Sequence, residues 1–181
     1  MAEQPKSAYF LVDNKAAVIS KTFAVLVDNE AGVLARVVGL FSGRGYNIES
    51  LTVAEVDHLD HTSRITIVTS GTPDVLEQIK HQLERLVPVH KVIDLTQEVP
   101  GIEREMALVK VSGQGDKRVE AMRLSDVFRA RVIDTTHSSF VFEITGNQQK
   151  IDAFVDLMRP LGLVEVSRTG VVAITRGPEA M

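Results

Sequence analysis

Apolar residues in the first half of the chain follow two different periods, and each period predicts one type of secondary structure. Residues 23–27 form an unbroken apolar run, which is typical of a strand that helices cover. Residues 33–41 place apolar side chains at helical spacing, and Thr72-Pro73 begins a second helix. Further strands are predicted at residues 48–56, 64–70 and 89–95. The order is β-α-β-β-α-β, the ferredoxin-like pattern, with both helices on one face of a four-stranded antiparallel sheet.

The second half of the chain repeats this pattern. Strands are predicted at residues 106–111, 132–136, 140–145 and 163–166, helices at 116–129 and 147–159, and residues 171–174 could extend the sheet. We therefore predict an α+β fold of two ferredoxin-like βαββαβ domains. Residues 1–19 are an N-terminal extension, residues 20–96 the first domain, residues 97–104 the linker and residues 105–181 the second domain.

Composition narrows the class of protein. The 181 residues include 20 Lys and Arg against 24 Asp and Glu, a net charge of −4, which argues against a general nucleic-acid binder. The chain has no cysteine, so disulfides, thiolate nucleophiles and cysteine-ligated zinc are excluded. Its apolar runs of about five residues are far shorter than the roughly 20 that span a bilayer, and no signal peptide is visible. We expect a cytoplasmic protein without a membrane or nucleic-acid partner.

The turn at residues 28–32 is the first candidate site. Gly32 at a helix N-terminus leaves backbone N–H groups unshielded, and these groups with the helix dipole favour an anion such as a carboxylate. Asn29 can cap the helix, adopt a left-handed conformation or contact a ligand. A plain helix start with a convenient glycine explains the same residues, so the pattern alone leaves both interpretations open.

The segment after the first helix is the second candidate site. Gly43 and Gly45 end the helix, and Asn47 enters the next strand at the end of the sheet near that helix, where a ligand's amino group could find a carbonyl acceptor. A helix stop without a ligand is equally compatible with these residues.

Catalytic, metal and RNA-binding functions have weaker support. His58 and His61 lie in a predicted loop without a further ligand, and the sequence has no phosphate-binding loop or nucleophile elbow. RNA-recognition modules stack bases on aromatic residues of their central strands, but residues 64–70 contain none. Phe140 and Phe142 have the spacing of one buried face. A phosphatase would need a basic phosphate loop, whereas the first turn carries Glu30, which repels phosphate.

Residues 29–53, with the sequence NEAGVLARVVGLFSGRGYNIESLTV, are the most specific stretch of the chain. This run resembles the N-terminal ACT domain of the small, regulatory subunits of acetolactate synthase, also called acetohydroxyacid synthase. Shorter segments are similar to the same family at residues 103–105, 108–110, 128–129, 133–134, 150–154 and 168–172. The resemblance covers residues 20–177 and is weakest in the loop at residues 57–63.

The resemblance implies a regulatory subunit that has neither a catalytic site nor a cofactor of its own. Its partner would be the large catalytic subunit, which carries thiamine diphosphate, Mg²⁺ and FAD and condenses pyruvate with pyruvate or 2-oxobutyrate. The small subunit would raise that activity and confer feedback inhibition by valine in branched-chain amino-acid biosynthesis.

The resemblance also implies where the effector binds. ACT domains of this kind form a homodimer in which two sheets join side by side into one eight-stranded sheet, with effector sites at the interface. Four residues of the turn and helix start would hold the effector carboxylate: Asn29, Gly32, Val33 and Leu34. From the facing copy, Asn47 and Ile48 would bind the amino group and line the side-chain pocket.

A different class of function is a free-standing, amino-acid-binding regulator that acts on nucleic acid or on another enzyme. Co-purification distinguishes the two hypotheses, because only the first requires a large thiamine-dependent partner.

Overall fold

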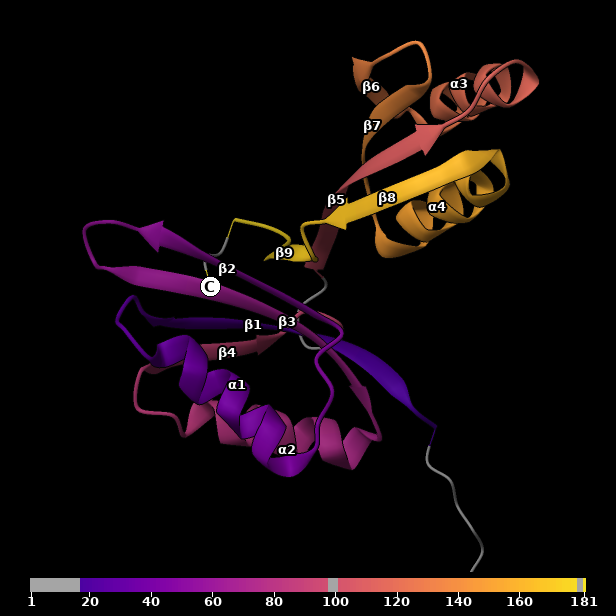
Figure 1. The fold of residues 1–181 in the computed structure, drawn as a ribbon. Helices are drawn as coiled ribbons and strands as arrows, with labels where there is room; N and C mark the ends of the chain where they lie inside the picture. Colours follow the sequence, from indigo (N-terminus) through magenta and orange to yellow (C-terminus); the bar gives the residue numbers. More distant parts are fainter. Residues whose placement is uncertain (1–16, 98–100, 179–180) are drawn as a thin grey trace, which may run out of the picture.

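The computed structural model describes residues 17–97, 101–178 and 181, which form two units (Figure 1). The expected N-terminal extension, residues 1–19, lies outside the described residues except for its last three. The elements of the first unit are β1 (Ile19–Asp28), α1 (Val33–Arg44), β2 (Ser50–Asp57), β3 (Thr62–Gly71), α2 (Pro73–Glu84) and β4 (Val89–Asp94). Its four strands form an antiparallel sheet in the order β2-β3-β1-β4, and both helices cover one face.

The second unit has the same plan. Its elements are β5 (Gly101–Ser112), α3 (Asp116–Phe128), β6 (Arg131–Thr135), β7 (Ser139–Gly146), α4 (Gln148–Gly162) and β8 (Leu163–Arg168), followed by β9 (Val172–Thr175). The strands β6-β7-β5-β8 pair in an antiparallel sheet. The prediction of two ferredoxin-like units in an α+β chain is therefore confirmed. None of the helices in the described part of the chain is long and apolar enough to cross a membrane.

Each unit has its own hydrophobic core between its helices and its sheet. In the first unit, the α1 stripe of Val33, Val37 and Phe41 is buried against strand residues such as Phe23 and Val25. In the second, Phe140 and Phe142 lie on the covered face of β7, as their spacing predicts, and Phe142 contacts Phe154 of α4 edge-on with ring centroids 6.0 Å apart. Such aromatic pairs add to the stabilisation from buried area.

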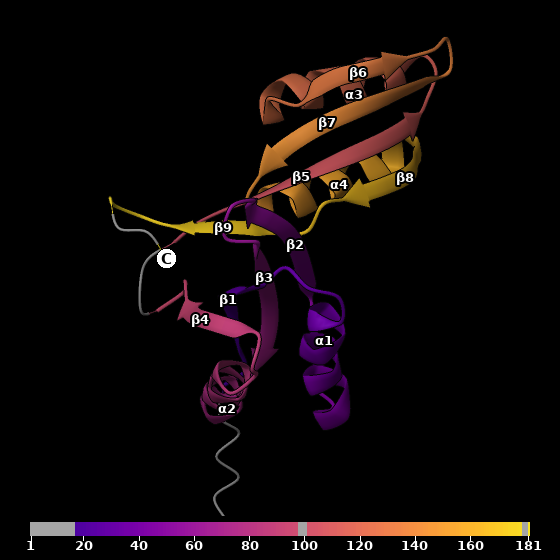
Figure 2. The ribbon, with the colours of Figure 1, turned by 90° about the vertical axis from the view of Figure 1, so that its left-hand side faces the viewer.

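The C-terminal strand β9 lies across the helix-free face of the first sheet (Figure 2). It pairs with the first residues of β5, from Gly101↔Thr175 to Arg104↔Val172, so it extends the second sheet as a fifth strand that is attached to β5 and not to β8. Ala173 packs there against Ala24, Ile93 and Leu95. The strand β1 is apolar on both faces because helices cover one face and β9 covers part of the other.

Several boundaries differ from the predicted ones. Helix α1 continues through Gly43, which we expected to end it, to Arg44, and Gly45 caps it. Residues 101–104, which we placed in the linker, belong to β5 because β9 pairs with them, whereas residues 98–100 lie outside the described residues. Helix α4 continues past the predicted end at residue 159 and includes Pro160. Because Pro160 lies in the last turn, its missing N–H group removes a single helical hydrogen bond.

Candidate effector site

The turn between β1 and α1 holds the first group of predicted site residues. The backbone N–H group of Asn29 donates a hydrogen bond to the carbonyl of His61 (2.7 Å), which fixes the end of β1 beside the β2–β3 hairpin. Gly32 precedes the helix with φ +92° and ψ −10°, a left-handed conformation that glycine adopts without strain. A Cβ atom at Gly32 would meet no described atom within 4 Å, so the space above the turn is open.

At the N-terminus of α1, the backbone N–H groups have no side-chain acceptor among the described residues. Among the described residues, no side chain caps α1, and its first turn, Val33 to Arg36, contains no acidic residue. Helix α4 provides the contrast, because the Asn147 side-chain oxygen accepts a hydrogen bond from the Lys150 N–H group (2.9 Å). The uncapped donors and the positive end of the helix dipole make the start of α1 suitable for a carboxylate.

The four predicted residues of this turn differ in exposure. Asn29 and Gly32 are exposed, and Leu34 is 42% exposed on the helix surface. Val33 is buried in the core of the first unit and is 3% exposed, so only its backbone can reach a ligand. The structure therefore brings these four residues together in one turn, where the Val33 N–H group donates to the Glu30 carbonyl (3.4 Å).

Asn47 and Ile48 lie at the opposite end of α1. The carbonyl oxygen of Asn47 accepts a hydrogen bond from the Thr69 hydroxyl (2.6 Å), while Ile48 packs on the core. Thr69 is near the end of β3, whereas the turn at Asn29 is bonded beside its start. At about 3.4 Å per residue, the length of β3 separates the two groups by roughly 25 Å. A single chain therefore does not bring them together, and the backbone carbonyl of Asn47 already accepts from Thr69.

Strand β2 forms an edge of the first sheet between these two groups. In the described residues it pairs with β3 alone, and Val53 and Val56 are 42% and 54% exposed. Its first residue, Ser50, closely follows Ile48, and its last residue, Asp57, pairs with Thr62 beside the Asn29 turn. The start of β2 is thus near Asn47 and Ile48, and its end is near the turn that contains Asn29 and Gly32.

Sequence reasoning missed a polar pair beside the turn. The His90 side chain of β4 lies 2.6 Å from the Asp28 carboxylate, and both side chains are about half exposed. Because 62 positions separate them, no local pattern indicates their contact. In the described part of the chain, no three histidine or acidic side chains form a group that could hold a metal. His58 instead lies 2.9 Å from Glu55.

Comparisons with known proteins agree with the fold and with the resemblance. Residues 23–91 match the family described as the AHAS small subunit-like ACT domain, and residues 104–177 match the small subunit of acetolactate synthase. The chain is 48% identical over 156 residues to a probable acetolactate synthase small subunit of Archaeoglobus fulgidus, which covers 86% of this chain and 96% of that protein.

Two further relatives cover similar lengths. The isozyme 3 small subunit of Escherichia coli is 47% identical over 163 residues, or 89% of this chain and 98% of the relative. The crystal structure of the small subunit from Thermotoga maritima superposes with a TM-score of 0.78 at 37% identity, over 89% of this chain and 99% of that one. With both of its units matched, the chain belongs to the family of acetolactate synthase small subunits, the regulatory subunits of that transferase.

Proposed function

We propose that the chain is a homodimeric regulatory subunit that activates the large catalytic subunit of acetolactate synthase and makes it sensitive to valine. The observation that carries the proposal is the uncapped N-terminus of α1 beside the open edge of β2. The catalytic partner would hold thiamine diphosphate, Mg²⁺ and FAD, and this chain would supply the effector site.

A dimer through β2 would complete the site. When two copies of an edge strand pair antiparallel about a twofold axis, the start of one strand lies beside the end of the other. The start of β2 follows Asn47 and Ile48, and its end lies beside the turn that contains Gly32. Pairing therefore places the Gly32 turn of one copy near Asn47 of the second copy and removes the separation found within one chain.

The residues that meet in this dimer suit a small aliphatic amino acid. The backbone N–H groups at the start of α1 would bind the carboxylate, and the exposed side-chain oxygen of Asn47 would accept a hydrogen bond from the ammonium group. Leu34 and Ile48 would provide apolar surface for the side chain. The Glu30 carboxylate lies 3.6 Å from Arg36, and this pairing limits its repulsion of the ligand.

Reconstitution with the catalytic subunit tests this function. We expect acetolactate formation to rise when the purified chain is added and to fall when valine is then added. An unchanged rate with both additions would contradict the proposal and favour a free-standing regulator.

A charge at the β2 edge tests the dimer. In Val53→Lys, paired edges would bring two lysines together, so sedimentation should show more monomer and calorimetry should show weaker valine binding. Val127→Lys is the matched control, because Val127 is 74% exposed on α3 in the second unit. Equal behaviour of the two variants would place the dimer contact elsewhere.

A further inference from the structure

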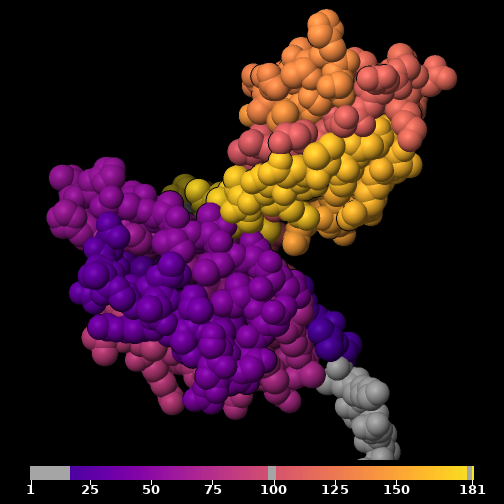
Figure 3. Space-filling view, viewed as in Figure 1, coloured from indigo at the N-terminus to yellow at the C-terminus, as the bar shows by residue number. Residues whose placement is uncertain are grey.

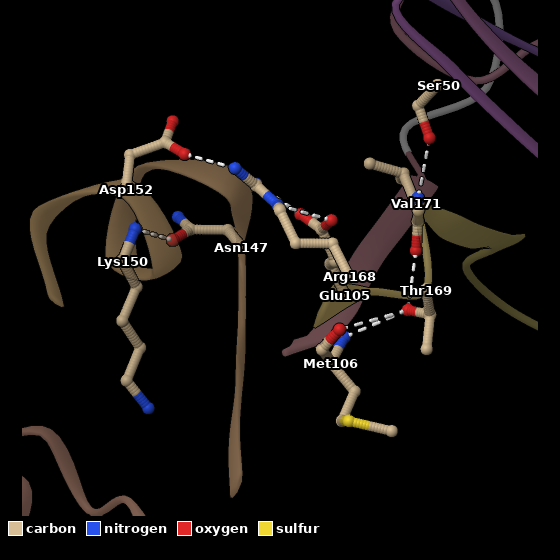
Figure 4. A network of polar contacts seen from close by, with 10 residues as sticks. Ser50, Glu105, Met106, Asn147, Lys150, Asp152, Arg168, Thr169 and Val171 are labelled. Carbon is tan, nitrogen blue, oxygen red and sulfur yellow. Dashed lines mark hydrogen bonds and ion pairs between the residues drawn. The ribbon is translucent and has the colours of Figure 1, made fainter. Parts of the chain in front are cut away.

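A short segment at residues 168–171 connects β8 with β9 and crosses from the second unit to the first; we call it the strap (Figures 3 and 4). Its first residue is fixed to the second unit. The Arg168 guanidinium donates to both Glu105 carboxylate oxygens (2.7 and 2.6 Å) and to Asp152 of α4 (2.6 Å). The hydrogen bonds that Arg168 donates to Glu105 raise the pKa of Arg168, so it remains charged.

The second residue of the strap, Thr169, is bonded to β5, the strand that also contains Glu105. The Thr169 N–H group donates to the Met106 carbonyl (3.0 Å), and the Thr169 hydroxyl accepts from the Met106 N–H group (3.1 Å). Thr169 thus keeps the direction of β8 up to the point where the chain leaves the second sheet.

The last two residues of the strap contact β2 of the first unit. The Val171 N–H group donates to the Ser50 hydroxyl (2.8 Å). Gly170 has φ +82°, and a Cβ atom there would lie 2.9 Å from both Ser50 Oγ and Thr52 Oγ1. A side chain at residue 170 would force the Ser50 and Thr52 hydroxyls to move, and the positive φ would strain it.

Ser50 belongs to the segment that contains the second half of the proposed effector site. The Glu49 N–H group donates to the Val68 carbonyl (2.8 Å), and the Asn47 carbonyl accepts from Thr69 (2.6 Å), so the segment at residues 47–50, which bends at Glu49, is held against β3. A cleft of about 360 Å³ adjoins the strap, lined by Glu49, Ser50, Arg168 and Thr169 among others. The strap therefore has open space on one side and a rigid attachment at each end.

We propose that the strap is the coupling element between the effector site and the second unit. A ligand that repositions Asn47 and Ile48 moves Ser50, and the Ser50–Val171 hydrogen bond with the close Gly170 contact passes this movement to β8 and α4 through Arg168. This inference rests on the proposed function and deepens it, because it assigns the route by which the bound effector acts.

Gly170→Ala tests the coupling, and Gly177→Ala is its matched control. Both glycines have positive φ (+82° and +93°), but a Cβ atom at Gly177 meets no described atom within 4 Å. Valine binding is measured by calorimetry on each purified chain, and valine inhibition is measured with each chain added to the catalytic subunit. We expect Gly170→Ala to bind valine within about threefold of the unmodified chain but to need about tenfold more valine for inhibition, or to be inhibited incompletely. Gly177→Ala should match the unmodified chain.

The outcomes separate the two proposals. Failure of the unmodified chain to bind valine would overturn the proposed function, and the coupling with it. Normal valine inhibition of the catalytic subunit in the presence of the Gly170→Ala chain would overturn the proposed coupling and leave the proposed function standing. Should Gly170→Ala not fold by circular dichroism, Ser50→Ala decides, because it removes the acceptor of the Val171 N–H group without adding an atom. Ser50→Ala with intact valine binding and weakened inhibition supports the coupling, and Ser50→Ala with unchanged inhibition overturns it.

Discussion

The two units share one fold, but their first helices begin differently. In the first unit, Gly32 lies in the left-handed region and the first turn of α1 carries no acidic side chain. In the second unit, the corresponding Gly115 has φ +58° and ψ −132°, and Asp116 occupies the first turn of α3. Asp116 already satisfies the preference of a helix N-terminus for negative charge and would repel an incoming carboxylate. The difference shows that two units of one fold can present helix N-termini of different chemistry, so the fold alone does not determine a site.

Their helix-free faces differ as well. Part of the first sheet is covered by β9, which packs Ala173 on Ala24, Ile93 and Leu95. The corresponding face of the second sheet carries the Lys110–Glu165 ion pair in a shallow pocket with Leu108 and Val141. In the first unit, the helix-free face of the sheet is partly covered and the N-terminus of α1 has no acidic side chain. In the second unit, that face is exposed and the N-terminus of α3 carries Asp116.

Gly32→Asp should have the largest effect, and that effect falls mainly on effector binding rather than on folding. Its carboxylate would occupy the N–H groups of α1 and oppose the effector carboxylate by about 4 kcal/mol at roughly 4 Å and an effective dielectric constant near 20. We therefore expect valine binding to weaken about a thousandfold, while activation of the catalytic subunit persists. Positive φ at Gly32 adds a folding cost of about 1–2 kcal/mol, because an L-residue is strained there.

Gly115→Asp is the control for this prediction. A Cβ atom at Gly115 also meets no described atom within 4 Å, and its positive φ imposes strain of the same kind. Valine inhibition should be retained in a folded Gly115→Asp chain. Normal inhibition in a folded Gly32→Asp chain would place the effector elsewhere.

Arg168→Ala should destabilise the second unit. Glu105 is 4% exposed and would lose both of its guanidinium hydrogen bonds, which leaves a buried charge without compensation. Because a third of the Arg168 side chain is exposed, we expect a loss of about 2 kcal/mol, or a fall in Tm of about 4–8 °C.

Arg159→Ala is the comparison for Arg168→Ala, because the Arg159–Asp156 pair (3.0 Å) is exposed on both sides. It should cost less than about 0.5 kcal/mol by thermal denaturation. Equal losses in the two variants would show that the Glu105 contact does not stabilise the fold.

Asn47→Ala should weaken valine binding about tenfold and leave folding nearly unchanged. The side chain is exposed, and the structural hydrogen bond at this position uses the backbone carbonyl, which alanine keeps. Calorimetry measures binding, and Gln149→Ala, at an exposed position of α4, is the control. Unchanged valine binding by Asn47→Ala would show that the Asn47 side chain does not contact the effector.

Local chemistry was predictable from the sequence, whereas contacts between distant segments were not. Gly32 at the start of a helix indicates open N–H groups because the neighbouring residues determine that geometry. The strand at residues 171–174 was also expected, but its partner is residues 101–104, about seventy positions earlier. Neither segment has a pattern that selects the other, so the position of β9 followed only from the structure.

The two halves of the effector site show the same limit. Asn47 and Gly32 lie near each other in the sequence and far apart in the folded chain, because α1 separates them. The family resemblance alone placed Asn47 on a facing copy, and this pairing of two copies stays a prediction. The close approach of Gly170 to β2 could not be predicted for the same reason, since Ser50 and Thr52 lie more than a hundred positions away.

Acid should loosen the hairpin of the first unit but not that of the second. The Asp57 carboxylate accepts hydrogen bonds from the N–H groups of Leu59 (2.7 Å) and Asp60 (3.1 Å), and these bonds lower its pKa in the folded chain. In the hairpin between β6 and β7, the neutral Thr136 hydroxyl accepts from Ser138 (3.3 Å) and Ser139 (3.0 Å).

The direction of this effect follows from the lowered pKa. The folded hairpin binds fewer protons than the unfolded chain, so its stabilisation is complete above the ordinary aspartate pKa of about 3.9 and is lost as the pH falls through the lower, folded value. Hydrogen exchange measured from neutral pH to about pH 3 should show protection falling at Leu59 and Asp60 beyond the change at Ser138 and Ser139. Asp57→Asn should abolish this pH dependence, because an amide does not titrate. If Asp57→Asn retained the pH dependence of protection, a group other than Asp57 would cause it. The difference between the Asp57 carboxylate and the Thr136 hydroxyl would then not account for the different responses of the two hairpins to acid.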